Sequence, residues 1–174
     1  GMHWNLKQGG SYYVTRNDSS LIAFTIPEHP FQGMRIMASH SDSPSFKIKE
    51  NPEMESEGHY IRLNVERYGG MLFAPWFDRP LSVAGRVIVK DPSTDGKPSA
   101  CFLSKLVNID RDLLMIPNLA IHMDRDANNG HKYNAQKDML PLYGELTAKN
   151  TFFQTIAEAA NVTEDEILGH DLFL

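Results

Sequence analysis

The chain has 174 residues, a length typical of one domain or slightly more. Hydrophobic residues make up 41% and charged residues 22%, so the composition is that of an ordinary folded protein with a sizeable core. The 17 Lys and Arg against 22 Asp and Glu give a net charge of −5, which argues against a dedicated nucleic-acid binder and disfavours anionic membranes. The single Cys101 excludes a disulfide framework, and no apolar run approaches the roughly 18 residues of a membrane span. We therefore expect a cytoplasmic protein without nucleic-acid or membrane partners.

The first third of the chain predicts short strands joined by turns. Residues 11–25 flank the turn Arg16-Asn17-Asp18-Ser19 and indicate a β-hairpin. The apolar residues 34–38 predict a buried third strand that ends in a polar loop. Residues 45–49 alternate apolar and charged side chains, which predicts a half-exposed strand. The polar residues 50–58 are the expected linker between two domains.

The middle of the chain predicts further strands, and the end predicts helices. The strand-like segments are residues 60–67, 81–90, 101–109 and 118–123, and residues 92–98 predict a turn. Apolar side chains at helical spacing predict a helix over residues 151–160. Thr163 and Glu166 form a capping-box pattern, which predicts a second short helix that ends at Gly169. Strands first and helices last predict an α+β fold.

Two clusters contain residue types that bind metals or move protons. His40 and Asp42 follow the predicted third strand, and a carboxylate close to a histidine can orient the imidazole that binds a metal ion. The same two residues also fit an ordinary turn at a strand end, where the aspartate bonds the local backbone. If residues 122–126 formed a strand, His122 and the two following aspartates would share one face and make a small metal or acid–base site. Such alternation is also typical of a solvated turn.

Other features leave alternatives open. Phosphate-cradling, dinucleotide-binding, serine-hydrolase and His-Glu-x-x-His patterns are absent from the sequence. Cys101 lies in an apolar strand context and is expected to be buried and inert. Phe73, Trp76 and Phe77 lie beside glycine and proline, and such a cluster forms a packed corner, a recognition surface or a contact between subunits.

Several segments, in their order along the chain, resemble the aspartyl aminopeptidase family of metallopeptidases. They are Ala38-Ser39-His40-Ser41-Asp42-Ser43-Pro44, Tyr68-Gly69-Gly70, Trp76-Phe77-Asp78-Arg79-Pro80-Leu81, Ala84-Gly85-Arg86-Val87, Ile116-Pro117-Asn118-Leu119-Ala120-Ile121-His122-Met123-Asp124-Arg125 and Lys137-Asp138-Met139-Leu140-Pro141-Leu142. The match extends over nearly the whole chain. The resemblance implies an aminopeptidase with two divalent metal ions, usually zinc, that removes acidic residues from peptide N-termini and self-associates into a homo-oligomer.

The resemblance also assigns roles to residues. His40 corresponds to a metal ligand, and Asp42 to the catalytic carboxylate that supports it. His122 corresponds to a substrate-binding histidine that the assembly domain inserts into a neighbouring subunit's active site. The family's other metal ligands, bridging aspartate and general-base glutamate have no counterpart in this sequence. Since even a catalytic zinc usually keeps three protein ligands, the chain is expected to bind no metal tightly and to be inactive by itself.

The resemblance further predicts the domain organisation. Residues 1–57 are expected to be the first strands of an incomplete α/β metallopeptidase domain, and residues 58–174 an interposed, strand-rich dimerisation domain with late helices. The alternatives are a non-catalytic assembly module, and an unrelated β-rich binding domain, because fold analogy alone never fixes function.

Overall fold

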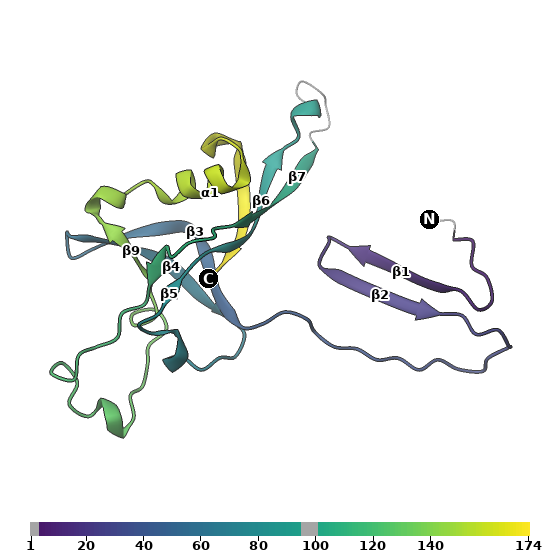
Figure 1. Cartoon of the computed structure of the whole chain (residues 1–174), viewed down its shortest axis with the longest axis horizontal. Coiled ribbons are helices and arrows are strands. Elements are labelled where there is room, and N and C mark those ends of the chain that lie inside the picture. The colour runs from purple at the N-terminus through teal and green to yellow at the C-terminus, as the bar shows by residue number, and fades with distance from the viewer. Residues whose placement is uncertain (1–3, 95–100) are drawn as a thin grey trace. The chain divides into compact units, whose positions relative to one another are not determined.

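The computed structural model describes residues 4–94 and 101–174, and the chain divides into two units, Gly1–Ser41 and Asp42–Leu174. The first unit contains a β-hairpin, and the second contains an eight-stranded sheet with one α-helix among its described residues (Figure 1). The assignment of residues 1–57 and 58–174 to two domains of a larger protein stays a prediction. No helix in the described part of the chain is long and apolar enough to cross a membrane.

The predicted hairpin of the first unit is confirmed. Strands β1 (Ser11–Arg16) and β2 (Ser20–Thr25) pair antiparallel, and the turn residues Asn17 and Asp18 both have a φ of 52°. Two consecutive residues with positive φ are typical of the type I′ turn, whose twist matches that of a hairpin. The Phe24 ring stacks on the rings of Trp4 and Tyr12, and these two rings are tilted relative to each other. None of residues 4–41 is buried, however, so this unit has no core among its described residues.

The predicted third strand over residues 34–38 is wrong. This segment has no regular structure, and the side chains of Met34, Ile36 and Met37 are 80%, 83% and 97% exposed. A strand is stabilised by a neighbour that pairs with its backbone and by burial of its side chains. The described residues provide neither for this segment, so apolar composition alone does not make it a strand.

The second unit is built on an antiparallel sheet whose strand order is β5-β8-β9-β4-β3-β10-β6-β7. Its strands are β3 (Ser45–Ser56), β4 (Tyr60–Tyr68), β5 (Pro80–Leu81), β6 (Ala84–Lys90), β7 (Phe102–Asn108), β8 (Leu114–Met115), β9 (Leu142–Glu145) and β10 (Ile167–Phe173). The strands predicted over residues 45–49, 60–67 and 101–109 are confirmed by β3, β4 and β7, and the one predicted over 81–90 is split between β5 and β6. Of the predicted turn over residues 92–98, Pro92–Thr94 form a 3-10 turn, and the remainder lies outside the described residues.

Two predictions about irregular segments are wrong. The expected linker over residues 50–58 belongs mostly to β3, where a register shift between Ile48 and Glu53 accommodates the buried Pro52. Proline is tolerated at such irregularities because no ladder hydrogen bond is required there. The strand expected over residues 118–123 is a loop. The Asn118 amide donates to an Asp78 carboxylate oxygen, and the Asn118 side chain accepts from the next amide, so side chains bond backbone groups that a strand would pair.

The C-terminal segment confirms one predicted helix and contradicts the other. Helix α1 (Phe152–Ala160) packs its apolar stripe inward. The capping box at Thr163 and Glu166 is present, but the helical segment that it starts is only one 3-10 turn long. The next seven residues form β10. β10 pairs with β6 on one side and touches β3 on the other, so long-range pairing overrides the local helix signal. The chain is therefore strand-rich, but it ends in a central strand and not in a helix.

The core of the second unit lies between the sheet, α1 and the aromatic corner. Its fully buried side chains include Phe46, Ile48, Leu63, Val83, Val87, Ile116, Met139, Phe152, Ile156 and Leu172. Phe73, Trp76 and Phe77 are partly buried against this core, and the Trp76 ring meets the Phe46 ring edge-on at 5.0 Å. The cluster is thus a packed corner. Cys101 is exposed, so the expected buried cysteine is wrong: the residue precedes β7 at the edge of the sheet.

Candidate functional site

The two residues of the predicted His-x-Asp motif lie in different units. His40 is exposed, at the end of the irregular stretch that follows residues 34–38 of the first unit. Asp42 is the first residue of the second unit, three residues before β3 begins. The motif therefore spans the boundary between the two units.

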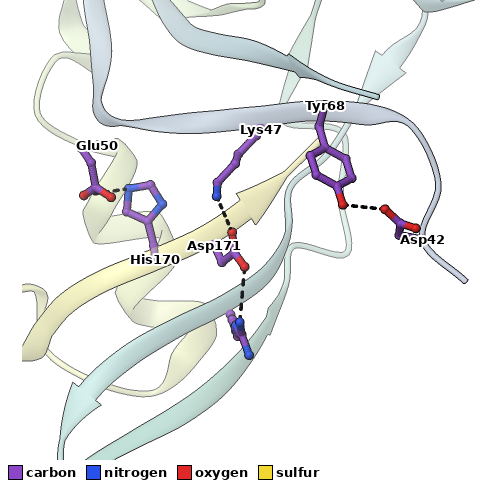
Figure 2. A network of polar contacts seen from close by, with 7 residues as sticks. Asp42, Lys47, Glu50, Tyr68, His170 and Asp171 are labelled. Atoms are coloured by element: carbon purple, nitrogen blue, oxygen red, sulfur yellow. Dashed lines mark hydrogen bonds and ion pairs between the residues drawn. The ribbon is translucent and has the colours of Figure 1, made fainter. Parts of the chain in front are cut away.

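Asp42 is bonded to the sheet by a tyrosine. The Tyr68 hydroxyl, at the end of β4, donates a hydrogen bond to Asp42 Oδ2 at 2.5 Å (Figure 2). This bond and the negative charge of Asp42 raise the pKa of Tyr68 above its usual value. The Tyr68 ring packs edge-on against Phe173 at a centroid distance of 5.5 Å. The carboxylate of the motif is therefore connected to the central strand β10 through one aromatic residue.

Beside this contact, three charged residues join neighbouring strands. Asp171 on β10 lies 2.8 Å from the Lys47 ammonium on β3 (Figure 2). It also lies 3.5 Å from the Arg86 guanidinium on β6. The hydrogen bond from Lys47 and the two positive charges hold the pKa of Asp171 below its usual value, against the opposing effect of burial. Gly85 precedes Arg86 with a φ of 153°, and β10 passes so close that a Cβ at this position would collide with the Asp171 backbone.

His170 is a buried histidine without a hydrogen-bond partner among the described residues. Its side chain is 3% exposed, and neither ring nitrogen is hydrogen-bonded. Phe153 of α1 lies 5.4 Å from the imidazole, measured between ring centroids, and Glu50 Oε2 lies 3.9 Å from Nε2 (Figure 2). Burial lowers the pKa of His170, and this outweighs the attraction of Glu50. Burial therefore favours the neutral form of the imidazole.

The predicted shared face of His122 and the following aspartates does not form. Residues 121–123 are a turn in which the Met123 amide donates to the Ala120 carbonyl, and His122 is exposed. Asp124 instead contacts His131, with 2.7 Å between Oδ2 and Nδ1. No spacing rule links two residues in such a loop, so sequence reasoning had no signal for this pair.

A hollow of about 540 Å³ lies beside this loop. Arg62, His131, Tyr133 and Lys137 are among its lining residues. The Arg62 guanidinium donates to the Lys137 and Leu140 carbonyls, and burial lowers its pKa. These bonds anchor the end of the loop to β4. Arg62 thus has a structural task that its position in an alternating strand does not reveal.

The described residues do not by themselves make a metal centre. They contain no group of three or more His, Cys, Asp or Glu side chains that could hold a metal ion. A catalytic zinc ion usually has three protein ligands. The arrangement in Figure 2 can orient a carboxylate and join strands, but it supplies no set of ligands.

Comparisons with known proteins give a consistent result. The family model described as Aminopeptidase I zinc metalloprotease (M18) matches residues 1–174. A probable M18 family aminopeptidase 2 from Clostridium acetobutylicum is 48% identical over 177 residues, which cover 98% of this chain and 40% of that protein. Its namesake from Ectopseudomonas mendocina is 43% identical, with 97% of this chain and 39% of that protein covered. The chain thus spans about 40% of the length of the curated relatives it matches.

Solved structures agree with the fold. The structure of Chaetomium thermophilum mApe1 has a TM-score of 0.80 and 31% identity, and the match covers 97% of this chain and 40% of that one. The structure of the S. cerevesiae mApe1 dodecamer has a TM-score of 0.66 and 24% identity over 95% of this chain and 36% of that one, and this likeness shows the fold alone.

Proposed function

Because the chain belongs to the M18 family of aminopeptidases, we propose that it contributes to a metalloaminopeptidase once joined to the further segments that its relatives carry. The observation that carries this proposal is the family match over residues 1–174, which includes the His40-Ser41-Asp42 motif. The substrates are peptides with an N-terminal Asp or Glu, and the complete enzyme uses two divalent metal ions, zinc by the description of the family.

Within this proposal, His40 is a metal ligand and Asp42 orients the site. The hydrogen bond from Tyr68 to Asp42 supports an orienting role, because carboxylates around metal ligands are themselves held by hydrogen bonds. His122 binds substrate in the active site of a neighbouring subunit, and its exposure in a turn is compatible with reaching another molecule.

The described residues contain no set of three ligands for a zinc ion, which supports the proposal that the 174-residue chain hydrolyses no peptide by itself. The test is incubation of the purified chain with zinc or cobalt and with peptides that begin with Asp, Glu or Leu. We expect no turnover of any of them. Metal-dependent release of the first residue would contradict the inactivity of the chain, whereas an extended protein that cleaves only the Leu peptide would contradict the acidic specificity.

The site residues are tested in the extended protein by metal analysis. We expect His40→Ala to lower the bound metal per subunit and Asp42→Asn to weaken metal affinity about 10- to 100-fold. His29→Ala is the matched control, because His29 is an exposed histidine of the same unit without an assigned role. Unchanged metal content in the first two variants would remove the site assignment.

The proposed role of His122 is separable from metal binding. His122→Ala is expected to raise KM and to reduce the rate while the metal content stays at the wild-type value. Because the histidine acts in a neighbouring subunit, mixing this variant with a His40→Ala variant should restore part of the activity in mixed oligomers. A loss of metal in His122→Ala would contradict the assignment.

The second candidate function is self-association. The aromatic corner that the sequence suggests for this role is partly buried against the core, and its exposed part stays a candidate contact. The sheet presents Phe102 and Leu106, which are 62% and 83% exposed. Light scattering at increasing concentration tests this function, and a strictly monomeric chain at high concentration would contradict it.

A further inference from the structure

The segment that carries His122, residues 118–124, buries little of its own apolar surface. It belongs to the connection between β8 and β9, which extends away from the sheet (Figure 1). Its apolar side chains Leu119, Ile121 and Met123 are all exposed. A segment with so few buried apolar contacts opens easily unless other contacts restrain it. The position of His122 therefore depends on the polar contacts at the two ends of the segment.

The start of the segment is bonded to Asp78, two residues before β5. Asp78 Oδ1 accepts a hydrogen bond from the Asn118 amide at 2.9 Å, and the Asp78 amide donates to the Ile116 carbonyl at 2.9 Å. Phe77 forms a β-bridge with the same residue, Ile116, which is fully buried. The first end of the segment is therefore fixed beside the core.

The other end of the segment is held through both carboxylate oxygens of Asp124. Oδ2 lies 2.7 Å from His131 Nδ1, and Oδ1 accepts a hydrogen bond from the Asp126 amide at 3.2 Å. A carboxylate accepts hydrogen bonds, so His131 donates from Nδ1. The side chains of His131 and Asp124 are only 27% and 26% exposed, which limits competition from water. This bond joins positions seven residues apart and closes the loop beyond His122.

His131 is in turn held by a row of aromatic rings. Its imidazole lies 4.7 Å from the Tyr133 ring, and the Tyr133 ring lies 5.0 Å from the Phe77 ring, measured between centroids. Phe77 packs against the core. Hollows of about 540 and 330 Å³, both lined by Leu119, His131 and Tyr133, adjoin the loop, so contacts at a few points hold it. Both ends of the segment thus converge on the neighbouring residues Phe77 and Asp78.

We propose that Asp124 and His131 are positioning residues for His122: their hydrogen bond closes the loop and sets the place at which His122 meets a second subunit. The inference deepens the proposed function and rests on the role given there to His122. A group that is already held in its binding geometry loses less conformational freedom when the substrate arrives, which raises affinity. Asp124 and His131 act only through His122 and are not themselves expected to touch the substrate.

The first test is a double-mutant cycle in the extended protein, with a peptide that begins with Asp. Asp124→Ala should lower kcat/KM by about tenfold, mainly by raising KM, with the metal content unchanged, because His122 loses its fixed position. In a His122→Ala background the same substitution should change kcat/KM by less than about twofold, because its effect passes through His122. Asp126→Ala is the matched control, since Asp126 lies in the same loop and its carboxylate does not cap the described 3-10 turn that follows it.

Two substitutions of His131 separate the hydrogen bond from the ring. His131→Asn keeps a nitrogen donor near the place of Nδ1 and loses the ring, whereas His131→Phe keeps a ring beside Tyr133 and loses the donor. We expect His131→Asn to retain more of the wild-type kcat/KM, and His131→Phe to resemble Asp124→Ala. The opposite order would mean that ring packing alone holds the loop, and it would overturn the role of the hydrogen bond.

Limited digestion with trypsin follows the loop in the 174-residue chain without any assay of peptide hydrolysis. Arg125 is exposed and directly follows Asp124, so cleavage after Arg125 reports opening of the loop. His131→Phe leaves the residues around this cleavage point unchanged, and the loss of one hydrogen bond should speed cleavage by about 3- to 10-fold. Cleavage after Arg35, in the first unit, is the internal control, and the midpoint of urea unfolding establishes that the fold is kept.

The outcomes distinguish this inference from the proposed function. A wild-type KM for His122→Ala would overturn the role of His122 and this inference with it. A raised KM for His122→Ala together with wild-type kinetics for Asp124→Ala would overturn this inference alone. It would also be overturned if the effects of the two substitutions multiplied in the double variant, because Asp124 would then act independently of His122. Equal rates of cleavage after Arg125 in the wild type and in His131→Phe would contradict the closure of the loop.

Discussion

The two units of the chain differ in how they are held together. The second unit has a continuous core, in which Phe46, Phe152 and Leu172 have no exposed surface. In the first unit none of residues 4–41 is buried, and the hairpin is held by its own ladder, a tight turn and the contacts of the Phe24 ring with the rings of Trp4 and Tyr12. An isolated hairpin is marginally stable in water. The second unit therefore carries the folding stability of this chain, whereas the first carries His40 of the motif.

The folding stability of the chain and the proposed metal ligand His40 therefore belong to different units. Substitutions in the second unit should change the free energy of unfolding, and equivalent substitutions in the first should not. Asp42 stands at the boundary, bonded to the stable unit through Tyr68. The proposed metal ligand two residues earlier takes no part in that core.

The largest expected effect is that of Phe46→Ala. Phe46 is fully buried on β3 and contacts the rings of Phe73 and Trp76, so its removal leaves a cavity in the core. We expect a loss of about 3–5 kcal/mol in the free energy of unfolding, measured by urea titration with circular dichroism. Ile36→Ala in the first unit is the control, with a change close to zero, because Ile36 is 83% exposed. Equal losses in both variants would break the contrast between the units.

The next effect concerns a cap that comes from a distant strand. Glu53 on β3 accepts hydrogen bonds from the Asn150 and Phe152 amides at the start of α1, where Thr151 makes no side-chain cap. Glu53→Ala should cost about 1–3 kcal/mol, because two amides lose a charged acceptor. Glu55→Ala is the matched control, since the ion pair of Glu55 with Lys149 is exposed to water. Similar losses for both variants would contradict the capping role.

The elements that sequence predicted correctly have local signals. The hairpin of residues 11–25 has its turn residues, and the helix of residues 151–160 has its apolar stripe. β10 was missed because the capping box before it is a genuine local signal, whereas the pairing of β10 with β6 depends on residues far away in the chain. The linker predicted over residues 50–58 failed for a similar reason: the hairpin partner β4 holds these polar residues in a strand.

The candidate site likewise contains features with a local signal in the sequence and features that depend on long-range contacts. The His40 and Asp42 motif is contiguous and was found directly, although its metal role stays a prediction. The hydrogen bond from Tyr68 to Asp42 joins residues 26 positions apart, and no local pattern indicates such a contact. The buried state of His170 could not be predicted either, because it depends on Phe153 of α1, which is distant in sequence and packs beside the imidazole on β10.

A smaller effect is expected at His170, where the second unit buries a titratable group. Replacing the imidazole by Leu removes two nitrogens without hydrogen bonds, so His170→Leu should raise the free energy of unfolding at pH 7 by about 1 kcal/mol. The pKa of His170 lies below its usual value of 6.5, so protonation favours the unfolded chain. The free energy of unfolding of the wild type should thus fall as the pH drops from 6.5 towards the folded-state pKa of His170. The negative charge of Glu50 stabilises the protonated imidazole and reduces this loss, whereas the positive charge of Lys47 increases it.

The measurement is urea unfolding between about pH 7.5 and about pH 5, because this range includes the usual pKa of histidine. The curve of stability against pH should be flatter for His170→Leu than for the wild type. His59→Leu is the control, because His59 is an exposed histidine of the same unit. Parallel pH curves for wild type and His170→Leu would show that His170 does not titrate differently in the folded and unfolded chain.

The smallest effect is that of Asp171→Asn, because the ion pairs of Asp171 are about one-third exposed and screened by water. The pKa of Asp171 is lowered, first by the hydrogen bond from Lys47, so its contribution is present above the usual carboxyl value of 3.8 and is lost as the pH falls through the folded-state pKa. We expect a loss of about 0.5–1 kcal/mol at pH 7 that diminishes below pH 3.8 and at high salt. A loss that stays constant down to acid pH would instead indicate that the carboxyl acts through packing, and the stability of the sheet would then owe nothing to this cluster of charges.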